Sequence, residues 1–240
     1  MLPRGGARLP AGSVGLRADV PPTQHREQRN EASSPNINPY TNYPSPPMTE
    51  TEIKLPVANV AAMRRLLRRL GWRVSVRRHL EHNLVFDRPD GSLLAAGSLL
   101  RLRSAGKLCL LTVKRPMRPS ALHKVREEFE IETTDTASAT AILGALDYQI
   151  AWRYEKYRTQ FTRQGAKGKI LLDETPIGNY LELEGDPGWI DATAIQLGFG
   201  VDDYITASYR GLFVEQARGN KKAPRDMVFP ARKRPPKSIQ

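Results

Sequence analysis

The sequence lacks the features that would place it in an oxidising compartment or in a membrane. Cys109 is the only cysteine in 240 residues, so no intrachain disulfide can form, and a zinc site built from several cysteines is excluded. No apolar run approaches the length of about 20 residues that crosses a bilayer, and the N-terminus has no continuous apolar segment of the secretory type. We therefore expect a cytoplasmic protein that does not bind membranes.

Acidic residues are outnumbered by basic ones, and the imbalance lies mostly near the two ends. The formal net charge is +12, but residues 1–47 carry five basic and three acidic side chains, and residues 218–240 carry eight basic and one acidic. Only +3 therefore remains for residues 48–217. Nucleic acid could bind at most through the basic C-terminal segment, and we expect no specific partner there because such runs are usually just solvated and no aromatic residues are interleaved for stacking. The oligomeric state cannot be inferred from these patterns.

Composition predicts one domain between two tails. Residues 1–47 are rich in Pro, Gly, Asn and Ser and have few apolar residues to bury, so we expect a disordered Pro-rich tail. Met48 is an alternative translation start, which would remove that tail from the mature protein. Residues 218–240 are expected to form a disordered basic tail. The folded domain is predicted to span residues 48–217.

Alternating apolar positions and turn signals predict about eight strands in this domain. Their approximate ranges are 49–55, 73–87 (in one or two pieces), 98–104, 107–115, 124–133, 151–163, 168–174 and 179–184. Short turn sequences such as Asp90-Gly91 and Ala105-Gly106 indicate antiparallel neighbours. Helices are predicted at 56–71, 186–198 and 203–216, with a weaker one after Asp135. These elements predict an α+β fold in which an eight-stranded antiparallel sheet closes into a β-barrel, with helices packed outside.

Charged side chains recur two residues apart on most of these strands. Because side chains alternate between the two faces of a strand, such residues share one face. The acidic members are Glu50, Glu52, Glu128, Glu130, Asp173, Glu182 and Glu184, and the basic members are Lys54, Arg101, Arg103, Lys114, Arg126, Lys156 and Arg158. Alternation alone is most often explained by a sheet with one apolar face and one face in water. The repeated pairing of like charges, with both signs present, favours an enclosed site for one highly charged ligand.

A triphosphate chain is a ligand that fits this set of charges. Its oxygens require several cationic donors on different sides, best supplied by arginine forks and lysines. Paired glutamates repel one another unless a cation lies between them, and carboxylate oxygens suit hard divalent cations such as Mg²⁺ or Mn²⁺. Desolvating this many charges costs several kcal/mol per ion, so we expect the tunnel to be wide and filled with water.

The motif Glu50-Thr51-Glu52-Ile53-Lys54 resembles the Glu-x-Glu-x-Lys signature of the CYTH superfamily. These triphosphate tunnel metalloenzymes include class IV adenylyl cyclases, thiamine triphosphatases and inorganic triphosphatases. The later motifs follow in the family's order, from Leu100-Arg101-Leu102-Arg103 and Arg126-Glu127-Glu128-Phe129-Glu130 to Tyr180-Leu181-Glu182-Leu183-Glu184. The resemblance covers nearly all of residues 49–215.

The resemblance implies a role for each charged residue. Glu50 and Glu52 are expected to be catalytic and to bind metal together with Glu182 and Glu184. Glu128, Glu130 and Asp173 are expected to support them or to bind a second metal. The phosphates are expected to be held by Lys54, Arg101, Arg103, Lys114, Arg126, Lys156 and Arg158.

The expected function is metal-dependent hydrolysis of an inorganic, thiamine or nucleoside triphosphate, and three alternatives remain. A class IV adenylyl cyclase would make cyclic AMP from ATP in the same tunnel, and His79, His82 and Asn83 are candidates for the base contacts that it requires. A non-catalytic module would bind polyphosphate without turnover. Nucleic-acid binding through the basic tail would be a secondary property. The spacing of residues does not identify the substrate.

Overall fold

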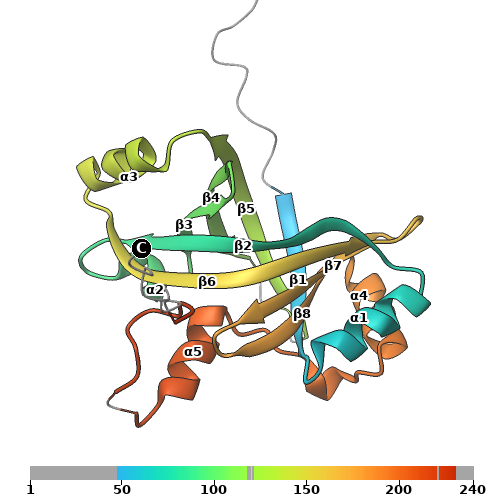
Figure 1. Ribbon diagram of the computed structural model, residues 1–240. Coiled ribbons are helices and arrows are strands. Elements are labelled where there is room, and N and C mark those ends of the chain that lie inside the picture. The colour runs from blue at the N-terminus through green and yellow to red at the C-terminus, as the bar shows by residue number, and fades with distance from the viewer. Residues whose placement is uncertain (1–47, 118–119, 121, 221, 231–240) are drawn as a thin grey trace, which may run out of the picture. The chain divides into compact units, whose positions relative to one another are not determined.

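The computed structural model describes residues 48–117, 120, 122–220 and 222–230 (Figure 1). Eight antiparallel strands form a closed barrel in the order β1-β5-β4-β3-β2-β6-β7-β8, which confirms the predicted fold class. The strands are β1 (Met48–Pro56), β2 (Arg73–Asp87), β3 (Leu99–Ala105), β4 (Leu108–Pro116), β5 (Lys124–Thr133), β6 (Gln149–Thr162), β7 (Gly168–Thr175) and β8 (Gly178–Gly185). Expectations about residues 1–47 and 231–240 lie outside the described part of the chain.

Strand β1 closes the barrel by pairing with two different strands. Its first half, Met48–Glu52, pairs with β5, and its second half, Glu52–Pro56, pairs with β8. Glu52 lies where the two halves meet, opposite Lys124 on one side and Glu184 on the other. Because inward and outward residues alternate, this register directs Glu50, Glu52 and Lys54 to the inside of the barrel.

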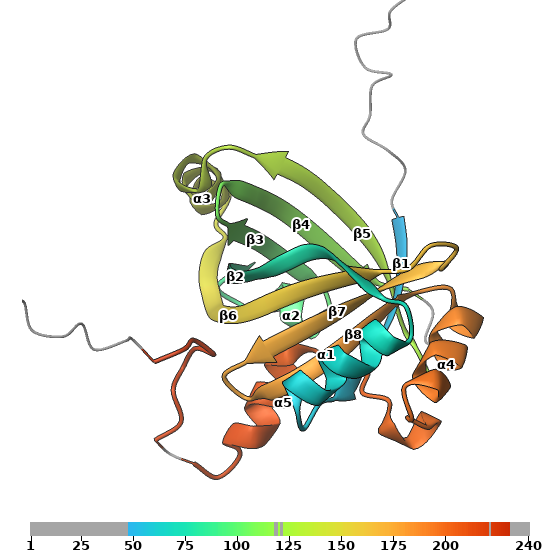
Figure 2. The same ribbon diagram turned by 45° about the vertical axis from the view of Figure 1, so that its right-hand side comes forward.

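The outward residues of β1, β7 and β8 form the main apolar core with two helices. Ile53, Leu55 and Leu183 are fully buried in a cluster that also includes Leu67 of α1 (Val60–Arg69) and Ile190 of α4 (Pro187–Gln196). Figure 2 shows α1 and α4 on the same side of the barrel, with α3 (Thr136–Ala145) far from them. The barrel interior is therefore left to the polar face of each strand.

Two predicted helices begin later than the sequence suggested. Strand β1 continues to Pro56, which pairs with Tyr180, and α1 begins only after Asn59, whose side chain accepts a hydrogen bond from Ala62 N. The helix expected from Asp203 is a short 3₁₀ turn, η1 (Val201–Asp203), followed by α5 (Tyr209–Ala217). Ile205 does not belong to a helical face.

Ile205 instead extends the pairing of β1. Its backbone N and O exchange hydrogen bonds of 2.9 Å each with Lys54, in an isolated antiparallel bridge. Backbone pairing therefore prevents a continuous helix between η1 and α5.

A four-residue helix, α2 (Ser92–Ala95), was not predicted. It begins after Gly91, whose φ of 70° favours glycine. No helix in the described residues has the length and apolar character needed to cross a bilayer.

The segment 222–230 packs on the barrel, whereas sequence analysis placed it in a disordered tail. Met227 N donates to Arg153 O at 3.0 Å, and Glu155 N donates to Met227 O at 2.9 Å, so the segment pairs in parallel with β6. The Met227 side chain is fully buried. The difference arises because this short apolar stretch, embedded in a basic sequence, finds a free strand edge and a core to cover.

Candidate functional site

A cavity of about 720 Å³ lies inside the barrel. All the charged residues predicted for the site line it, with the exception of Asp173. They are Glu50, Glu52, Lys54, Arg101, Arg103, Lys114, Arg126, Glu128, Glu130, Lys156, Arg158, Glu182 and Glu184. The charges of successive strands therefore converge on one enclosed space, as the sequence analysis required.

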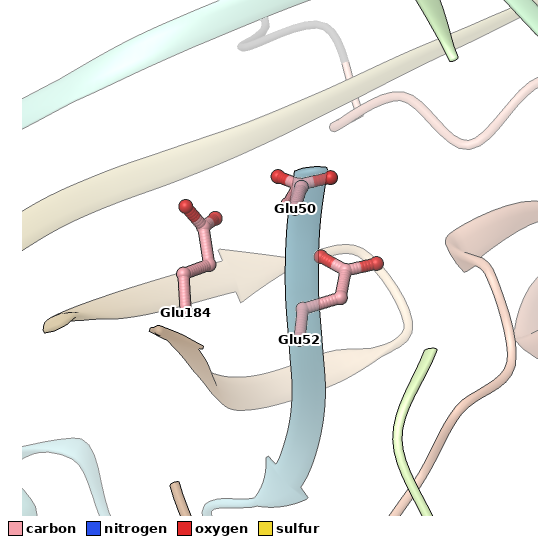
Figure 3. A group of neighbouring side chains, drawn as sticks. All are labelled: Glu50, Glu52 and Glu184. Carbon is pink, nitrogen blue, oxygen red and sulfur yellow. The ribbon is translucent and has the colours of Figure 1, made fainter. Parts of the chain in front are cut away.

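Three carboxylates form a compact acidic cluster on β1 and β8. One oxygen from each of Glu50, Glu52 and Glu184 lies within 4.8 Å of the others, and Figure 3 shows the three side chains on these neighbouring strands. Two factors bring them together. Glu50 and Glu52 are two residues apart on one strand, and Glu184 is the register partner of Glu52 across the β1–β8 pair. Of the predicted acidic residues, these three have the geometry of a cation site.

Glu182, the fourth glutamate that the resemblance groups with this cluster, faces the basic residues of the interior. Its carboxylate lies 3.3 Å from Lys54 Nζ and 3.8 Å from Lys156 Nζ, and it accepts a hydrogen bond from Arg158. Burial raises the pKa of Glu182, but Lys156, Arg158 and Lys54 outweigh burial and hold the pKa well below its usual range. Glu182 is therefore a counter-ion of three cations in this structure.

Asp173 is fully buried beneath the cavity wall and is not brought to the acidic cluster. Its oxygens accept hydrogen bonds from Lys156 Nζ at 2.8 Å, from Arg158 Nε and Nη2 at 2.7 Å each, and from Tyr209 Oη at 2.7 Å. Each oxygen is thus occupied by donors of the protein. This carboxylate orients two of the predicted phosphate-binding side chains.

Glu128 and Glu130 lie on β5, the strand that pairs with the first half of β1, beside the acidic cluster. Lys114 Nζ donates to Glu50 and is 3.1 Å from Glu128. Glu130 accepts a hydrogen bond of 2.7 Å from Thr112 and lies 4.0 Å from Arg101. Lys114 therefore links the acidic cluster to Glu128, while Glu130 contacts Thr112 and Arg101.

Arg101 and Arg103 are the guanidinium groups least engaged by carboxylates. Arg101 donates to the Tyr154 hydroxyl at 3.1 Å and to Thr112 at 3.3 Å, and Arg103 donates to Asn83 at 3.3 Å. In contrast, Arg158 forms two hydrogen bonds to Asp173 and one to Glu182. The Arg101 and Arg103 forks therefore retain donor capacity for an anion in the cavity.

Three charged residues that were not predicted contact the predicted site residues. Lys124 donates to Glu52 at 2.9 Å, Lys169 lies 2.7 Å from Glu184, and the buried Glu81 lies 3.6 Å from Arg103. Lys124 lies two residues before Arg126 on β5, so the same alternation of charged residues could have identified it. Lys169 has Lys167 two residues before it, but Lys167 precedes β7, and Glu81 has no Asp, Glu, Lys or Arg two positions away. Only the strand register identifies these two residues.

The candidate base contacts of a cyclase do not gather at the mouth of the cavity. Asn83 is buried and accepts a hydrogen bond from Arg103, while His82 pairs with Glu155 at 2.8 Å. His79 lies 3.6 Å from Glu81, and none of the three lines the cavity.

Electrostatics distinguish the members of the acidic cluster. Burial raises the pKa of Glu52, but Lys54 and Lys124 outweigh this and lower it well below the usual value. Burial also raises the pKa of Glu184, and there Lys169 offsets only part of the effect, so the pKa remains raised. Burial lowers the pKa of Lys124 to about 8 despite the favourable contact with Glu52. Nearby lysines thus outweigh the effect of burial on the pKa of Glu52, whereas at Glu184 burial outweighs the effect of Lys169.

The interior charges are paired more tightly than expected. Lys54 and Lys156 are each 2% exposed, and both have carboxylates within 4 Å. Ion pairing therefore compensates desolvation along the walls of the cavity. The expectation of a wide, water-filled tunnel stays a prediction.

Comparisons with known proteins agree with this architecture. The family model of the CYTH domain matches residues 48–194. None of the curated proteins matches the chain by sequence. A solved structure of a proposed adenylate cyclase from Vibrio parahaemolyticus is 22% identical, with a TM-score of 0.61, and the match covers 70% of this chain and 98% of that one.

Two further solved structures are similar. The PH1012 protein from Pyrococcus horikoshii OT3 is 20% identical, with a TM-score of 0.58, and the match covers 68% of this chain and 98% of that one. A proposed adenylyl cyclase from Hippeastrum, reported to have a dominant triphosphatase activity, is 21% identical, with a TM-score of 0.53 and coverage of 70% and 96%. At these identities the likeness to solved structures establishes the fold alone.

Proposed function

The chain belongs to the CYTH domain family, and on that premise we propose that it is a hydrolase that cleaves a triphosphate inside the barrel with the help of divalent cations. One observation carries the proposal. The cluster of Glu50, Glu52 and Glu184 opens on the same cavity as Arg101 and Arg103, so cation ligands and phosphate donors meet in one space. The dominant triphosphatase activity of the Hippeastrum protein supports hydrolysis as the reaction.

The phosphate chain would be held by the basic wall of the cavity. Arg101 and Arg103 have free donor capacity and can each offer a fork to phosphate oxygens. The remaining cations of the wall would add charge from other sides, and they are Lys54, Lys114, Arg126, Lys156 and Arg158. Their carboxylate partners, above all Asp173 and Glu182, fix their positions before the substrate arrives. Such preorganised charge is worth more in an enclosed site than in water.

The acidic cluster fits Mg²⁺ or Mn²⁺. Glu50, Glu52 and Glu184 offer only carboxylate oxygens, which hard cations prefer, and Glu184 lacks full compensation by the protein's own cations. A cation bound there would neutralise phosphate charge and lower the pKa of a bound water. Glu128 would support this cluster through Lys114, and Glu130 would help to position Arg101. We place Asp173 and Glu182 among the residues that orient cations, in contrast to the metal-binding roles inferred from the sequence.

The proposal is tested by a substrate panel. The purified chain is incubated with tripolyphosphate, thiamine triphosphate and ATP in the presence of Mg²⁺ or Mn²⁺, and orthophosphate and cyclic AMP are measured. We expect orthophosphate release that stops with a chelator. The substitution Glu52→Gln should lower kcat/KM by about 100-fold or more, because it removes a charged ligand from the cluster. The matched control Glu132→Gln changes an exposed glutamate of β5 and should keep the wild-type rate.

Each alternative predicts a different product. A cyclase yields cyclic AMP and pyrophosphate from ATP, and a binding module shows saturable binding of tripolyphosphate with no product at all. Unchanged metal-dependent phosphate release in Glu52→Gln would remove the acidic cluster from the mechanism.

A further inference from the structure

The cavity-lining residues of β6 change from charged to aromatic along the strand. The inward residues of β6 run from Arg158 and Lys156 to Tyr154 and Trp152, all of which line the cavity. The register of the neighbouring strands extends this trend, since Val85 on β2 lies opposite Trp152 on one side and Arg101 on the other. An apolar and aromatic end of the cavity therefore adjoins the arginine pair directly.

Trp152 dominates that end. Its ring stacks on Tyr154 with centroids 4.9 Å apart and an interplanar angle of 23°, and it packs with Val85 in a cluster closed by Tyr209 of α5. The indole Nε1 is buried and has no hydrogen-bond partner among the described residues. The same is true of Trp72 and Trp189, but neither of those lines the cavity. Trp152 is thus the tryptophan that lines the cavity, while its N–H group is buried within the wall.

A bare triphosphate ion makes poor use of this end. It consists of charged oxygens around phosphorus and has no apolar surface to cover Trp152, Val85 and Leu99. A planar heterocycle offers an aromatic face that can lie against this surface. The cavity volume of about 720 Å³ lies in the range of pockets that hold such organic ligands.

We infer that the substrate is an organic triphosphate whose heteroaromatic group lies against Trp152 while its phosphates lie against Arg101 and Arg103. This inference rests on the proposed triphosphate site and narrows its substrate class, because it excludes inorganic triphosphate as the preferred substrate. Nucleoside and thiamine triphosphates share the required chemistry, and the test distinguishes them.

The first test compares substrates. Values of kcat/KM are measured for ATP, GTP, thiamine triphosphate and tripolyphosphate with the wild-type protein and with Trp152→Leu and Trp152→Phe. We expect one organic substrate to exceed tripolyphosphate about tenfold or more, and Trp152→Leu to lower that ratio by about tenfold or more, because aromatic stacking is lost. Trp152→Phe keeps an aromatic ring but lacks the N–H group, so it should retain most of the ratio. This variant distinguishes the contribution of the ring from that of the N–H group. The control Trp189→Phe, which alters a tryptophan outside the cavity, should keep the wild-type ratio.

The second test measures binding without turnover. An ATP analogue with a non-hydrolysable β–γ bridge is titrated without divalent cation, and tryptophan fluorescence is recorded. Quenching should occur in the wild-type protein and in Trp189→Phe and should be lost in Trp152→Phe. If Trp152→Leu fails to fold, Val85→Thr provides a polar change of similar size at the same end.

The outcomes separate this inference from the proposed function. A preference for tripolyphosphate, or an unchanged substrate ratio in Trp152→Leu, overturns the inference and leaves triphosphate hydrolysis intact. Failure to cleave any member of the panel overturns the hydrolase proposal, and the fluorescence titration still decides whether a heteroaromatic group binds at Trp152.

Discussion

The hydroxyl of Tyr209 donates a hydrogen bond of 2.7 Å to Asp173, and through it α5 is tied to the wall of the cavity. The same carboxylate binds Lys156 and Arg158, so one helix outside the barrel contributes to the position of two interior cations. Tyr209 lies beyond residues 48–194, which the family model matches. Contacts to the wall of the cavity therefore extend past the matched segment.

This relationship predicts the effect of removing the Tyr209 hydroxyl. Hydrogen bonds to charged groups contribute about 1.5–3 kcal/mol, so Tyr209→Phe should lower the free energy of unfolding by about that amount. Urea denaturation measures the change. Tyr180→Phe is the control, since this neighbouring tyrosine is partly exposed and its hydroxyl has no hydrogen-bond partner among the described residues. Equal losses in the two variants would contradict the assigned role of the bond.

Glu81 predicts a pH dependence of stability. Burial raises its pKa, but Arg158, Lys156 and Arg103 outweigh burial, so the pKa lies well below the ordinary value of 4.5. A carboxyl group whose pKa falls on folding stabilises the native state above its unfolded pKa, and this contribution is lost as the pH falls toward the folded pKa. Glu81→Gln should therefore cost about 3–5 kcal/mol near neutral pH, and the difference from wild type should narrow below pH 4.5.

Denaturant titrations from neutral to acidic pH provide the measurement for Glu81. Glu132→Gln, at an exposed position, should differ little from wild type throughout. A difference between Glu81→Gln and wild type that stays constant with pH would show that packing, not charge, explains the loss.

The close packing of Trp189 on two paired glycines predicts a sensitive position. A Cβ at Gly185 would lie 2.7 Å from the Trp189 ring and 2.9 Å from Lys167 O. Gly185→Ala should therefore destabilise the protein by about 1–3 kcal/mol, because both neighbours must shift. Gly144→Ala is the matched control, since nothing lies within 4 Å of a Cβ there and the residue is inside α3. That variant should gain about 0.5–1 kcal/mol, and thermal unfolding compares the two.

Met227, in the basic segment that follows α5, should contribute to the stability of the folded protein. Met227 is fully buried among aromatic side chains, so Met227→Ala should cost about 2–5 kcal/mol. Val228→Ala, at a neighbouring position that is 40% exposed, should cost about 0.5 kcal/mol or less. Hydrogen exchange gives a second measurement, since the Glu155 amide should lose protection only in Met227→Ala. Similar losses in both variants would mean that the segment does not pack as described.

Strand alternation made most of the cavity wall predictable. Arg101 and Arg103, like Glu50 and Glu52, share a face because the pleat repeats every two residues, and that rule does not depend on distant contacts. The roles within the wall were less predictable. Asp173 was expected to support the metal ligands or to bind a second metal, and its hydrogen-bond partners come from β6 and α5. No local pattern indicates which of many charges will be neighbours across the barrel.

Helix ends and the C-terminal segment show a second limit of sequence patterns. The apolar spacing from Asp203 onward fits a helix, but Ile205 pairs with Lys54 and interrupts it. Met227 was assigned to a charged tail because a single apolar residue forms no regular apolar spacing that would predict a helix or a strand. Tertiary contacts decide both cases.

The split pairing of β1 has a consequence for biosynthesis. Its first half can pair once β5 has been made, but its second half has no partner until β8, the last strand, has been synthesised. Until then Ile53 and Leu55 have no cover from β8, and the seam of the barrel stays open. Contacts between residues so far apart in the chain form slowly. The growing polypeptide therefore exposes an unpaired strand edge and apolar side chains until β8 has been made. Such exposed surface is prone to aggregation, and chaperones bind surfaces of this kind.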